Sequence, residues 1–384
     1  MDTESKGMIV LMAKIGILTL YKDNFGSILQ TYSTYSYLND LGFECEVLKI
    51  NYSTSLIDKI IRISKQMYMI LRYRNYLSDK LKQREANKKD IKLLSNKTKK
   101  LMDAFIKSNL KVIELDSRTG FDDINDKYDF FITGSDQVWN GFDEYYFLVF
   151  ADRDKRIAFA PSFGASLKEY YKKKVKRALS GFDVLSTREE FGVKIIKELT
   201  GREAFRLADP TILYGRDKWR GFAAKGIQKC NYILVHFLNK PNEMALRSIE
   251  EYIQLHDCSV YCICNRYEEY DQLSRFEFLD ISPYDYVALI NGADYVFTDS
   301  FHSTLFSLNL ETPFLTFERQ YLHGNSQSSR IEDLLGRVGM KDCYICEKEK
   351  PLIAERMEWN SDSMFEEERK ALKEYLGKAL RIHL

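Results

Sequence analysis

The residues best suited to chemistry follow a short buried strand in the second half of the chain. Tyr295–Thr298 is a β-branched and aromatic run that predicts a strand. The polar stretch Asp299–Ser303 comes next, and the apolar spacing after it predicts a helix that ends before Pro313. Ligands of open α/β sheets bind at the carboxyl ends of strands, where a helix N-terminus offers donors to an anion. His302, one of five histidines, lies at this point and suits proton transfer, although a capping and packing role is an equal alternative.

Polar turns that contain glycine or serine also follow predicted strands of the first half. These strands are Ile15–Leu20, Tyr128–Thr133, Ile157–Ala160 and Phe182–Ser186. Parallel α/β architecture brings such turns together at one sheet edge. Asp136 supplies a carboxylate there, although an aspartate after Gly-Ser is often only a turn former. Asn24, Gln137 and Trp139 suit a sugar through amide hydrogen bonds and an apolar ring face, with a core tryptophan as the alternative.

Composition excludes several classes of protein. The 384 residues are 45% hydrophobic and 29% charged with a net charge of +1, so the chain has no nucleic-acid signature. Seven scattered cysteines form no disulfide framework, which favours a reduced, cytoplasmic compartment, and a lone CxxC at Cys343–Cys346 predicts no metal site. No apolar run approaches the ~20 residues of a membrane span. Met12 is a plausible natural start, because strand one follows it directly.

The order of predicted elements indicates two α/β domains. We expect an N-terminal domain over residues 1–215, a C-terminal domain over residues 216–360 and a helix over 361–384 that packs back on the first domain. Leu207–Tyr214 is the predicted exit from the first domain, and Arg216–Lys229 is a predicted charged linker. Two Rossmann-like domains that face each other form a GT-B-like arrangement. The loop after the first strand lacks GxGxxG, so a dinucleotide is not indicated.

A basic helical insertion is predicted at about residues 58–107. Fifteen lysines and arginines stand there against five acidic residues, interleaved with tyrosines and helically spaced apolar residues. A solvated pair of helices is the simpler interpretation. The alternative is a patch that docks peripherally on an anionic membrane surface or carrier lipid.

Six short motifs occur in an order that resembles the polysaccharide pyruvyl transferase family. They are Asn24–Gln30, Gly134–Trp139, Ser162–Gly164, Ser186–Glu189, Ala208–Thr211 and Thr298–His302. The resemblance implies a GT-B-like fold. It also implies transfer of a pyruvyl group from phosphoenolpyruvate to sugar hydroxyls, which leaves a cyclic ketal on a cell-surface glycan or its lipid-linked oligosaccharide precursor.

The chain departs from this family at Ser300. Many members carry Arg-Leu-His where this chain has Ser300-Phe301-His302, so one donor-binding arginine is missing. By similarity Arg188 is the remaining donor-binding arginine, and we expect Arg330 to supply the missing charge. Ser300 and Asn325, the latter in the donor-rich loop 321–330, are further candidates for binding phosphoenolpyruvate.

Ketal formation requires an acid for the donor methylene carbon and a base for the sugar hydroxyl. We assign His302 as the acid, because an anionic site favours the imidazolium, and Asp136 as the base. Arginines and helix N-termini can carry the donor charge, so neither a metal nor a cofactor is expected. Two alternatives remain: a nucleotide-sugar glycosyltransferase, with Glu318 as a possible ribose ligand, and a non-catalytic glycan-binding relative.

Overall fold

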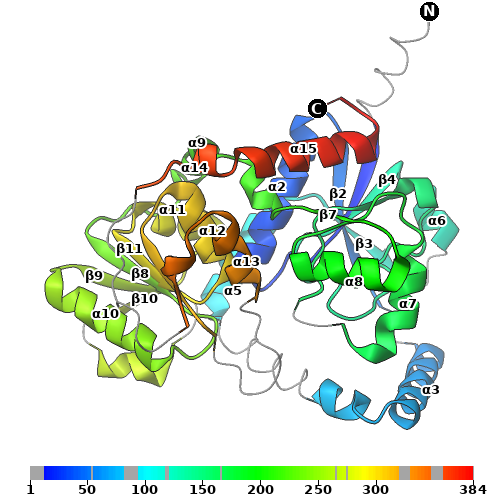
Figure 1. Ribbon diagram of the computed structural model, residues 1–384, viewed down its shortest axis with the longest axis horizontal. Helices are drawn as coiled ribbons and strands as arrows, with labels where there is room; N and C mark the ends of the chain where they lie inside the picture. Colours follow the sequence, from blue (N-terminus) through cyan, green and yellow to red (C-terminus); the bar gives the residue numbers. More distant parts are fainter. Residues whose placement is uncertain are drawn as a thin grey trace, which may run out of the picture.

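The computed structural model describes residues 13–52, 55–81, 94–116, 121–164, 167–263, 266–273, 276–319, 329–346 and 358–383. Its two large sheets are both parallel, and each is covered by helices (Figure 1). The first sheet has the order β3-β2-β1-β4-β5. Its strands are β1 (Lys14–Leu18), β2 (Glu44–Asn51), β3 (Val112–Asp116), β4 (Phe130–Thr133) and β5 (Arg156–Ala158). All of its pairings are parallel, and Ile15 of the central strand pairs with Cys45 on one side and Phe130 on the other.

The second sheet repeats this order with one more strand, as β10-β9-β8-β11-β12-β13. Its strands are β8 (Tyr232–His236), β9 (Ser259–Ile263), β10 (Phe276–Leu279), β11 (Tyr295–Thr298), β12 (Phe314–Phe317) and β13 (Tyr344–Ile345). In both sheets the winding direction reverses beside the first strand, between β1 and β4 and between β8 and β11. Ligands of doubly wound sheets bind at these switch points. The fold is α/β with two Rossmann-like sheets in a GT-B-like arrangement, and the predicted fold class is confirmed.

Helices connect the strands of both sheets. Those of the first half are α2 (Phe25–Asp40), α3 (Leu56–Arg72), α5 (Asn96–Asn109), α6 (Phe121–Asn125), α7 (Glu169–Leu179), α8 (Glu190–Thr200) and α9 (Arg216–Ala223). Those of the second half are α10 (Glu243–Leu255), α11 (Pro283–Gly292), α12 (Phe301–Leu310), α13 (Ser329–Arg337), α14 (Ser361–Met364) and α15 (Glu366–Leu380). A two-stranded sheet of β6 (Ser186–Thr187) and β7 (Phe205–Arg206) and a 3₁₀ helix, η2 (Pro210–Leu213), lead out of the first half.

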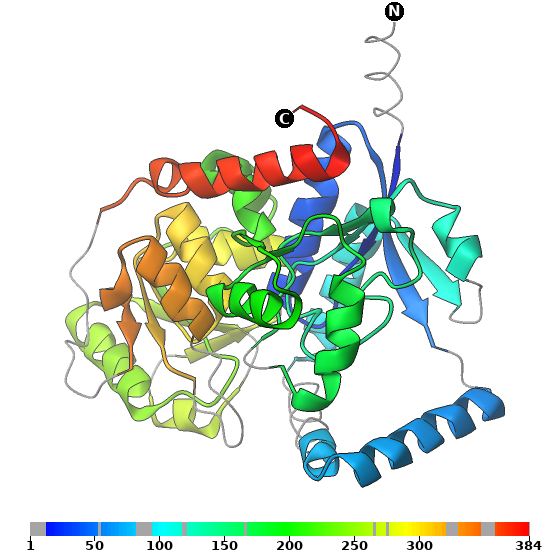
Figure 2. The same cartoon turned by 45° about the vertical axis from the view of Figure 1, so that its right-hand side comes forward.

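Helix α15 crosses from the second half to the first, as Figure 2 shows in red. The Tyr375 hydroxyl donates to the Ala158 carbonyl at the end of β5 at 2.6 Å. The Nε of Arg369 donates to the carbonyl of Ile212 in η2 at 2.8 Å. Leu376 is fully buried in a core that also contains residues of both sheets, such as Ile15 and Leu234. The described part of the chain contains no helix that is both long and apolar enough to cross a membrane.

Two predicted elements differ from the structure. Only the last residue of the predicted strand Phe182–Ser186 lies in a strand, because β6 begins at Ser186 and the preceding buried side chains occupy a turn. The predicted linker Arg216–Lys229 is largely helix α9, whose Trp219 and Phe222 are buried. Within the predicted insertion 58–107, the structure describes α3 and α5, whereas residues 82–93 lie outside the described residues. Met12, the predicted natural start, also lies outside the described residues.

Candidate active site

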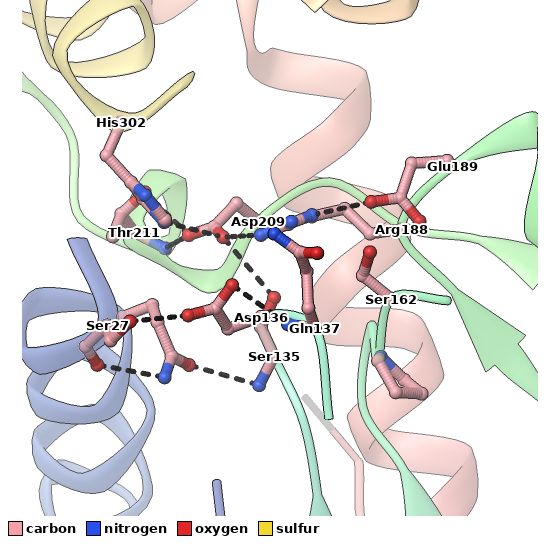
Figure 3. Close-up of polar contacts among 12 residues, drawn as sticks. Ser27, Ser135, Asp136, Gln137, Ser162, Arg188, Glu189, Asp209, Thr211 and His302 are labelled. Carbon is pink, nitrogen blue, oxygen red and sulfur yellow. Dashed lines mark hydrogen bonds and ion pairs between the residues drawn. The ribbon is translucent and has the colours of Figure 1, made fainter. Parts of the chain in front are cut away.

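The candidate active site lies where the loops at the two switch points approach one another (Figure 3). The first sheet contributes the N-terminus of α2 after β1 and the turn Gly134–Gln137 after β4. The second sheet contributes the start of α12, which follows β11, and His302 lies in its first turn. The loop around Asp209, between the two halves, lies among them. Helix N-termini present backbone donors and partial positive charge, which favours an anionic ligand.

Asp209 is the hub of the polar contacts in this site. Its Oδ2 accepts from Nη1 of Arg188 at 2.8 Å and lies 3.4 Å from Nε2 of His302. Oδ1 accepts from the amide and hydroxyl of Thr211 at 3.0 and 2.9 Å. Burial raises the pKa of Asp209, but His302, Arg188 and the Thr211 amide outweigh burial and hold that pKa well below its usual range. Asp209 is therefore a carboxylate that joins an arginine of the first half to a histidine of the second.

Arg188 is buried between two carboxylates. Its side chain is 1% exposed, and its Nε donates to Oε1 of Glu189 at 3.1 Å in addition to the Asp209 bond. Burial lowers the pKa of Arg188, but the charges of Glu189 and Asp209 more than offset burial and raise the net pKa above its usual value. Its Nη2 has no hydrogen-bond partner among the described residues. A buried donor without a partner costs free energy, and a bound anion would satisfy it.

Arg330 faces the same aromatic ring as Arg188. The guanidinium carbons of Arg188 and Arg330 lie 4.6 and 5.8 Å from the centre of the Phe301 ring. Burial and the neighbouring Arg188 charge lower the pKa of Arg330 to about 10, so it remains a cation at neutral pH. When the side-chain amide of Gln137 is oriented with its oxygen toward the Arg330 guanidinium, this oxygen accepts from both Nη atoms of Arg330 at 3.1 Å. Two buried cations that repel each other make this part of the site favourable for an anion.

The His302 ring packs directly on Gly26, in the first turn of α2. A Cβ placed on Gly26 would lie 2.0 Å from Nδ1 of His302, so only glycine allows this approach. Nε2 of His302 is the ring nitrogen that faces Asp209. It lies 3.4 Å from Oδ2 of Asp209, and no well-aligned hydrogen bond joins the two atoms. The predicted acid therefore has a carboxylate beside its Nε2.

Asp136 lies in the turn after β4 with a left-handed backbone, at φ 60°. Its Oδ2 accepts from the Ser27 hydroxyl at 2.5 Å, and its Oδ1 accepts from the backbone amide of Gln137 at 2.8 Å. The second bond is the one expected of a turn former, whereas the first connects the carboxylate to the start of α2. The structure thus brings Asp136 and His302 to the same helix terminus.

The other predicted site residues have structural contacts of their own. Asn24 and Ser300 cap α2 and α12 by accepting from the amides of Ser27 at 3.2 Å and Ser303 at 3.4 Å. The predicted sugar platform Trp139 requires correction. Its ring is fully buried, stacks on Phe147 at 5.0 Å and lies within a core cluster, so no ring face is open to a sugar.

The remaining predictions concern Asn325, Glu318 and the absence of a metal site. Asn325 falls in residues 320–328, outside the described residues. Glu318 has an exposed side chain after β12, and its backbone pairs with Ile345. Within the described ranges, no group of three His, Cys, Asp or Glu side chains is arranged to hold a metal ion.

Sequence reasoning gave no role to several residues of the site. Asp209 and Glu189 lie within motifs that carry the family resemblance, and their positions in the motifs could have indicated them. His236, at the end of β8, had no such signal; its Nδ1 lies 2.6 Å from the Ser303 hydroxyl. The Asp299 carboxylate, beside Arg319 at 3.3 Å, accepts from two backbone amides after β8.

The fold and this site define a two-sheet α/β protein with buried cationic side chains near its switch points. The family model for polysaccharide pyruvyl transferase matches residues 24–321. The chain therefore belongs to the polysaccharide pyruvyl transferase family, and the resemblance found in its motifs is confirmed. A search of curated proteins finds no match.

Solved structures with similar architecture share little sequence with the chain. A UDP-N-acetylglucosamine 2-epimerase from Rickettsia bellii has 12% identity and a TM-score of 0.48, covering 96% of each chain. The Neisseria meningitidis UDP-GlcNAc 2-epimerase bound to UDP-GlcNAc has 11% identity and a TM-score of 0.45, covering 97% of this chain and 94% of the other. A Thermobaculum terrenum O-GlcNAc transferase has 11% identity and a TM-score of 0.44, covering 96% of this chain and 64% of the other.

Proposed function

We propose that this protein transfers a pyruvyl group from phosphoenolpyruvate to two hydroxyls of a glycan, forming a cyclic ketal. The supporting observation is the pair of buried arginines, Arg188 and Arg330, on the ring of Phe301 beside the His302–Asp209 pair. Phosphoenolpyruvate carries a phosphate and a carboxylate, and two guanidinium groups with helix N-termini match that charge. The acceptor is a cell-surface polysaccharide or its lipid-linked precursor, modified on the cytoplasmic side.

The overall reaction consumes one donor and two hydroxyl groups. The methylene carbon of phosphoenolpyruvate gains a proton and becomes a methyl group, which leaves an oxocarbenium-like centre at the adjacent carbon. Two sugar oxygens form bonds to that carbon, the carbon–oxygen bond to phosphate breaks, and inorganic phosphate leaves. Of the two hydroxyl protons, one balances the proton delivered to the methylene carbon and the other leaves with phosphate or solvent.

His302 and Asp136 divide the proton transfers in this proposal. The imidazolium of His302, stabilised by Asp209, delivers the proton to the methylene carbon. Asp136 accepts a proton from the attacking hydroxyl, after the Ser27 hydroxyl that now occupies its Oδ2 turns away. Both residues are 7% exposed, so the reaction would take place in a largely water-excluded site.

Calorimetric titration of phosphoenolpyruvate into wild type and Arg330→Gln tests the donor assignment. We expect wild type to bind and Arg330→Gln to bind at least tenfold more weakly, because one charge-assisted contact to the anion is lost. Arg337→Gln is the matched control, since Arg337 is on the same helix but pairs with Asp333 and Glu368. Arg188→Lys is preferable to alanine at position 188, because an alanine would leave Asp209 and Glu189 buried without their partner.

A rescue experiment tests whether Arg330 replaces the arginine missing at Ser300. In the Arg330→Gln background, Ser300→Arg should restore part of the donor affinity, at a cost of about 1 kcal/mol for the lost helix cap. Phosphate release and ketal formation with a glycan acceptor complete the test. If phosphoenolpyruvate does not bind while a UDP-sugar does, the pyruvyl assignment is wrong and a glycosyltransferase takes its place. Donor binding without phosphate release for any acceptor would favour the non-catalytic alternative.

A further inference from the structure

Residues 55–81, here called the α3 arm, carry an unusual exposed apolar stripe. In Figures 1 and 2 the α3 helix stands below α7, away from the two sheets. Leu56 is 76% exposed, Met67 59% and Leu71 86%. Ile60 and Ile63 are also more than half exposed. A contiguous exposed apolar face on a folded protein marks a binding surface.

The apolar residues of α3 share one side of the helix. With 3.6 residues per turn, Leu56, Ile60, Ile63, Met67 and Leu71 fall on one stripe, spaced by three or four residues. Lys65 and Arg72 fall on the opposite side. This pattern, an exposed apolar stripe with a basic polar face, is that of helices that lie flat in a lipid interface.

A second basic surface adjoins the arm. Tyr76 of the arm packs edge-on against Tyr170 of α7 at 5.1 Å, and Asp79 pairs with Lys168 at 3.4 Å. These contacts fix the arm to the start of α7. Exposed basic side chains then continue along α7: Lys173, Lys174, Lys176 and Arg177. Apolar and cationic groups therefore gather on neighbouring helices.

Charge decides between a lipid surface and a second copy of the chain. Residues 55–81 contain six lysines and arginines against two aspartates, a net charge of +4. An isologous dimer would bring two such arms together and oppose like charges. An anionic lipid surface attracts every one of these cations and accepts the apolar stripe as well. At 17 residues with charges along its length, α3 suits a helix lying in the interface rather than one crossing it.

We propose that the α3 arm and α7 together dock the protein on an anionic membrane surface. The arm starts just after β2, which ends at Asn51 on the sheet edge that also carries Gly134–Gln137 after β4. Docking would turn this edge toward the headgroups. On the proposed function, a sugar linked to a membrane lipid would then be presented to the site, which makes a lipid-linked glycan the preferred acceptor.

Vesicle co-sedimentation tests the docking surface on the full-length chain, without donor or acceptor. We expect binding to phosphatidylcholine vesicles that contain 30% phosphatidylglycerol in low salt, and little binding to pure phosphatidylcholine or in 0.5 M salt. Lys173→Gln/Lys174→Gln should weaken partitioning about 25-fold, at roughly fivefold for each cation removed. Lys370→Gln/Lys373→Gln, on the exposed face of α15, is the matched control and should bind as wild type does.

The apolar stripe is tested separately by Ile63→Glu/Met67→Glu. These residues are exposed in the free protein, so the fold should persist, and vesicle binding should be lost. Leu255→Glu, on a 71% exposed residue of α10, is the control that should bind normally. Absence of binding to anionic vesicles in low salt overturns the proposal, as does equal loss in the control variants. Dimerisation of wild type that Ile63→Glu/Met67→Glu abolishes would assign the surface to a second copy.

The proposed pyruvyl transfer and the proposed membrane docking can be tested independently. Calorimetric binding of phosphoenolpyruvate should be the same in wild type and in Ile63→Glu/Met67→Glu. Vesicle binding without phosphoenolpyruvate binding would overturn the pyruvyl assignment but not the docking surface. Phosphoenolpyruvate binding without vesicle binding would overturn the docking surface but not the pyruvyl assignment.

Discussion

At the scale of single residues, the candidate site depends on very close approaches between side chains of the two halves. Asp209 contacts Arg188 on one side and His302 on the other, and all three are buried. Because Asp209 is a buried carboxylate paired with the Arg188 cation, removing Arg188 would leave its charge uncompensated in the interior. The position of His302 is set from its other side by Gly26, which has no side chain to keep the imidazole away.

Replacing Gly26 by alanine should reduce activity far more than it reduces stability. The added Cβ would lie 2.0 Å from Nδ1 of His302, so the ring must move away from Asp209. We expect a loss of about 1–3 kcal/mol in the free energy of unfolding and a fall in ketal formation on the order of 100-fold. Urea denaturation and a turnover assay give the two values.

Gly221→Ala is the control for this change. Gly221 is an exposed glycine within α9, and a Cβ there would have no heavy atom within 4 Å. It should leave activity unchanged and raise stability by about 0.5–1 kcal/mol, since alanine favours a helix. Full activity in Gly26→Ala would show that ketal formation does not depend on the position of the His302 ring.

Motif position predicts part of this site from sequence. Asp136, Arg188, His302 and Arg330 were proposed from residues far apart in the chain, and the structure places them around one pair of helix termini. Asp209 was not singled out, because an Asp-Pro pair is also an ordinary turn. Trp139 was misassigned because the same large ring serves a sugar site or a core, and only packing distinguishes the two.

At the scale of elements, a buried histidine joins β8 to α11 and α12. His236 Nδ1 and the Tyr286 hydroxyl both contact the Ser303 hydroxyl, at 2.6 and 2.9 Å. Burial, followed by the charges of Arg319 and His302, lowers the pKa of His236 to about 3. This junction therefore requires a neutral imidazole, and it holds the helix that carries His302.

Acidification should weaken this junction in a defined range of pH. An unfolded histidine has a pKa of about 6.5, so between about pH 6.5 and 3 the unfolded chain binds a proton that the folded chain does not. Stability should therefore fall as the pH drops through this range, by up to about 1.4 kcal/mol per pH unit from His236 alone. Urea denaturation at pH 7, 6 and 5 measures the slope.

Comparison of two variants isolates the contribution of His236. His236→Gln should have a shallower slope than wild type, because it removes the titrating ring but can keep a bond to Ser303. His256→Gln, at the exposed end of α10, should keep the wild-type slope. Identical slopes in all three proteins would contradict the assignment of His236.

The sequence predicts some of these elements better than others. Strands β1, β4 and β11 are largely apolar runs bounded by turns, and they were located correctly. Helix α9 was taken for a linker, since its charged residues conceal the apolar spacing of Trp219, Phe222 and Ala223. Strand β3 was not predicted, because it lies at the sheet edge and only Leu115 is buried in it.

At the scale of the whole molecule, α15 connects the two halves through one continuous core. Leu376 and Tyr375 are buried on its inner side, whereas Lys373 is exposed. Arg369 donates to Ile212 of η2 and to the Asn309 side chain of α12, at 2.8 and 3.2 Å. The helix thus contacts both halves near the loop that carries Asp209.

Leu376→Ala should destabilise the molecule as a unit. Removing a fully buried leucine costs about 2–5 kcal/mol, and because its core cluster includes residues of both sheets, both halves should unfold together. Urea denaturation followed by fluorescence and by circular dichroism should give one shared, lowered midpoint. Lys373→Ala should remain within about 0.5 kcal/mol of wild type. Two separated transitions would show that the halves are energetically independent.

The contact between Asp209 and His302 has a consequence for inheritance. Its two residues come from different halves of the chain, on either side of the boundary at which a recombination event would exchange whole halves. A hybrid gene of that kind keeps each sheet intact but pairs an acid and a histidine that have different parents. Ser300 and Arg330, by contrast, lie only thirty codons apart on one side of the boundary. A recombination event at the boundary therefore keeps positions 300 and 330 together, so a move of the arginine from one to the other is inherited as a unit. Asp209, which contacts His302, would come from the other parent.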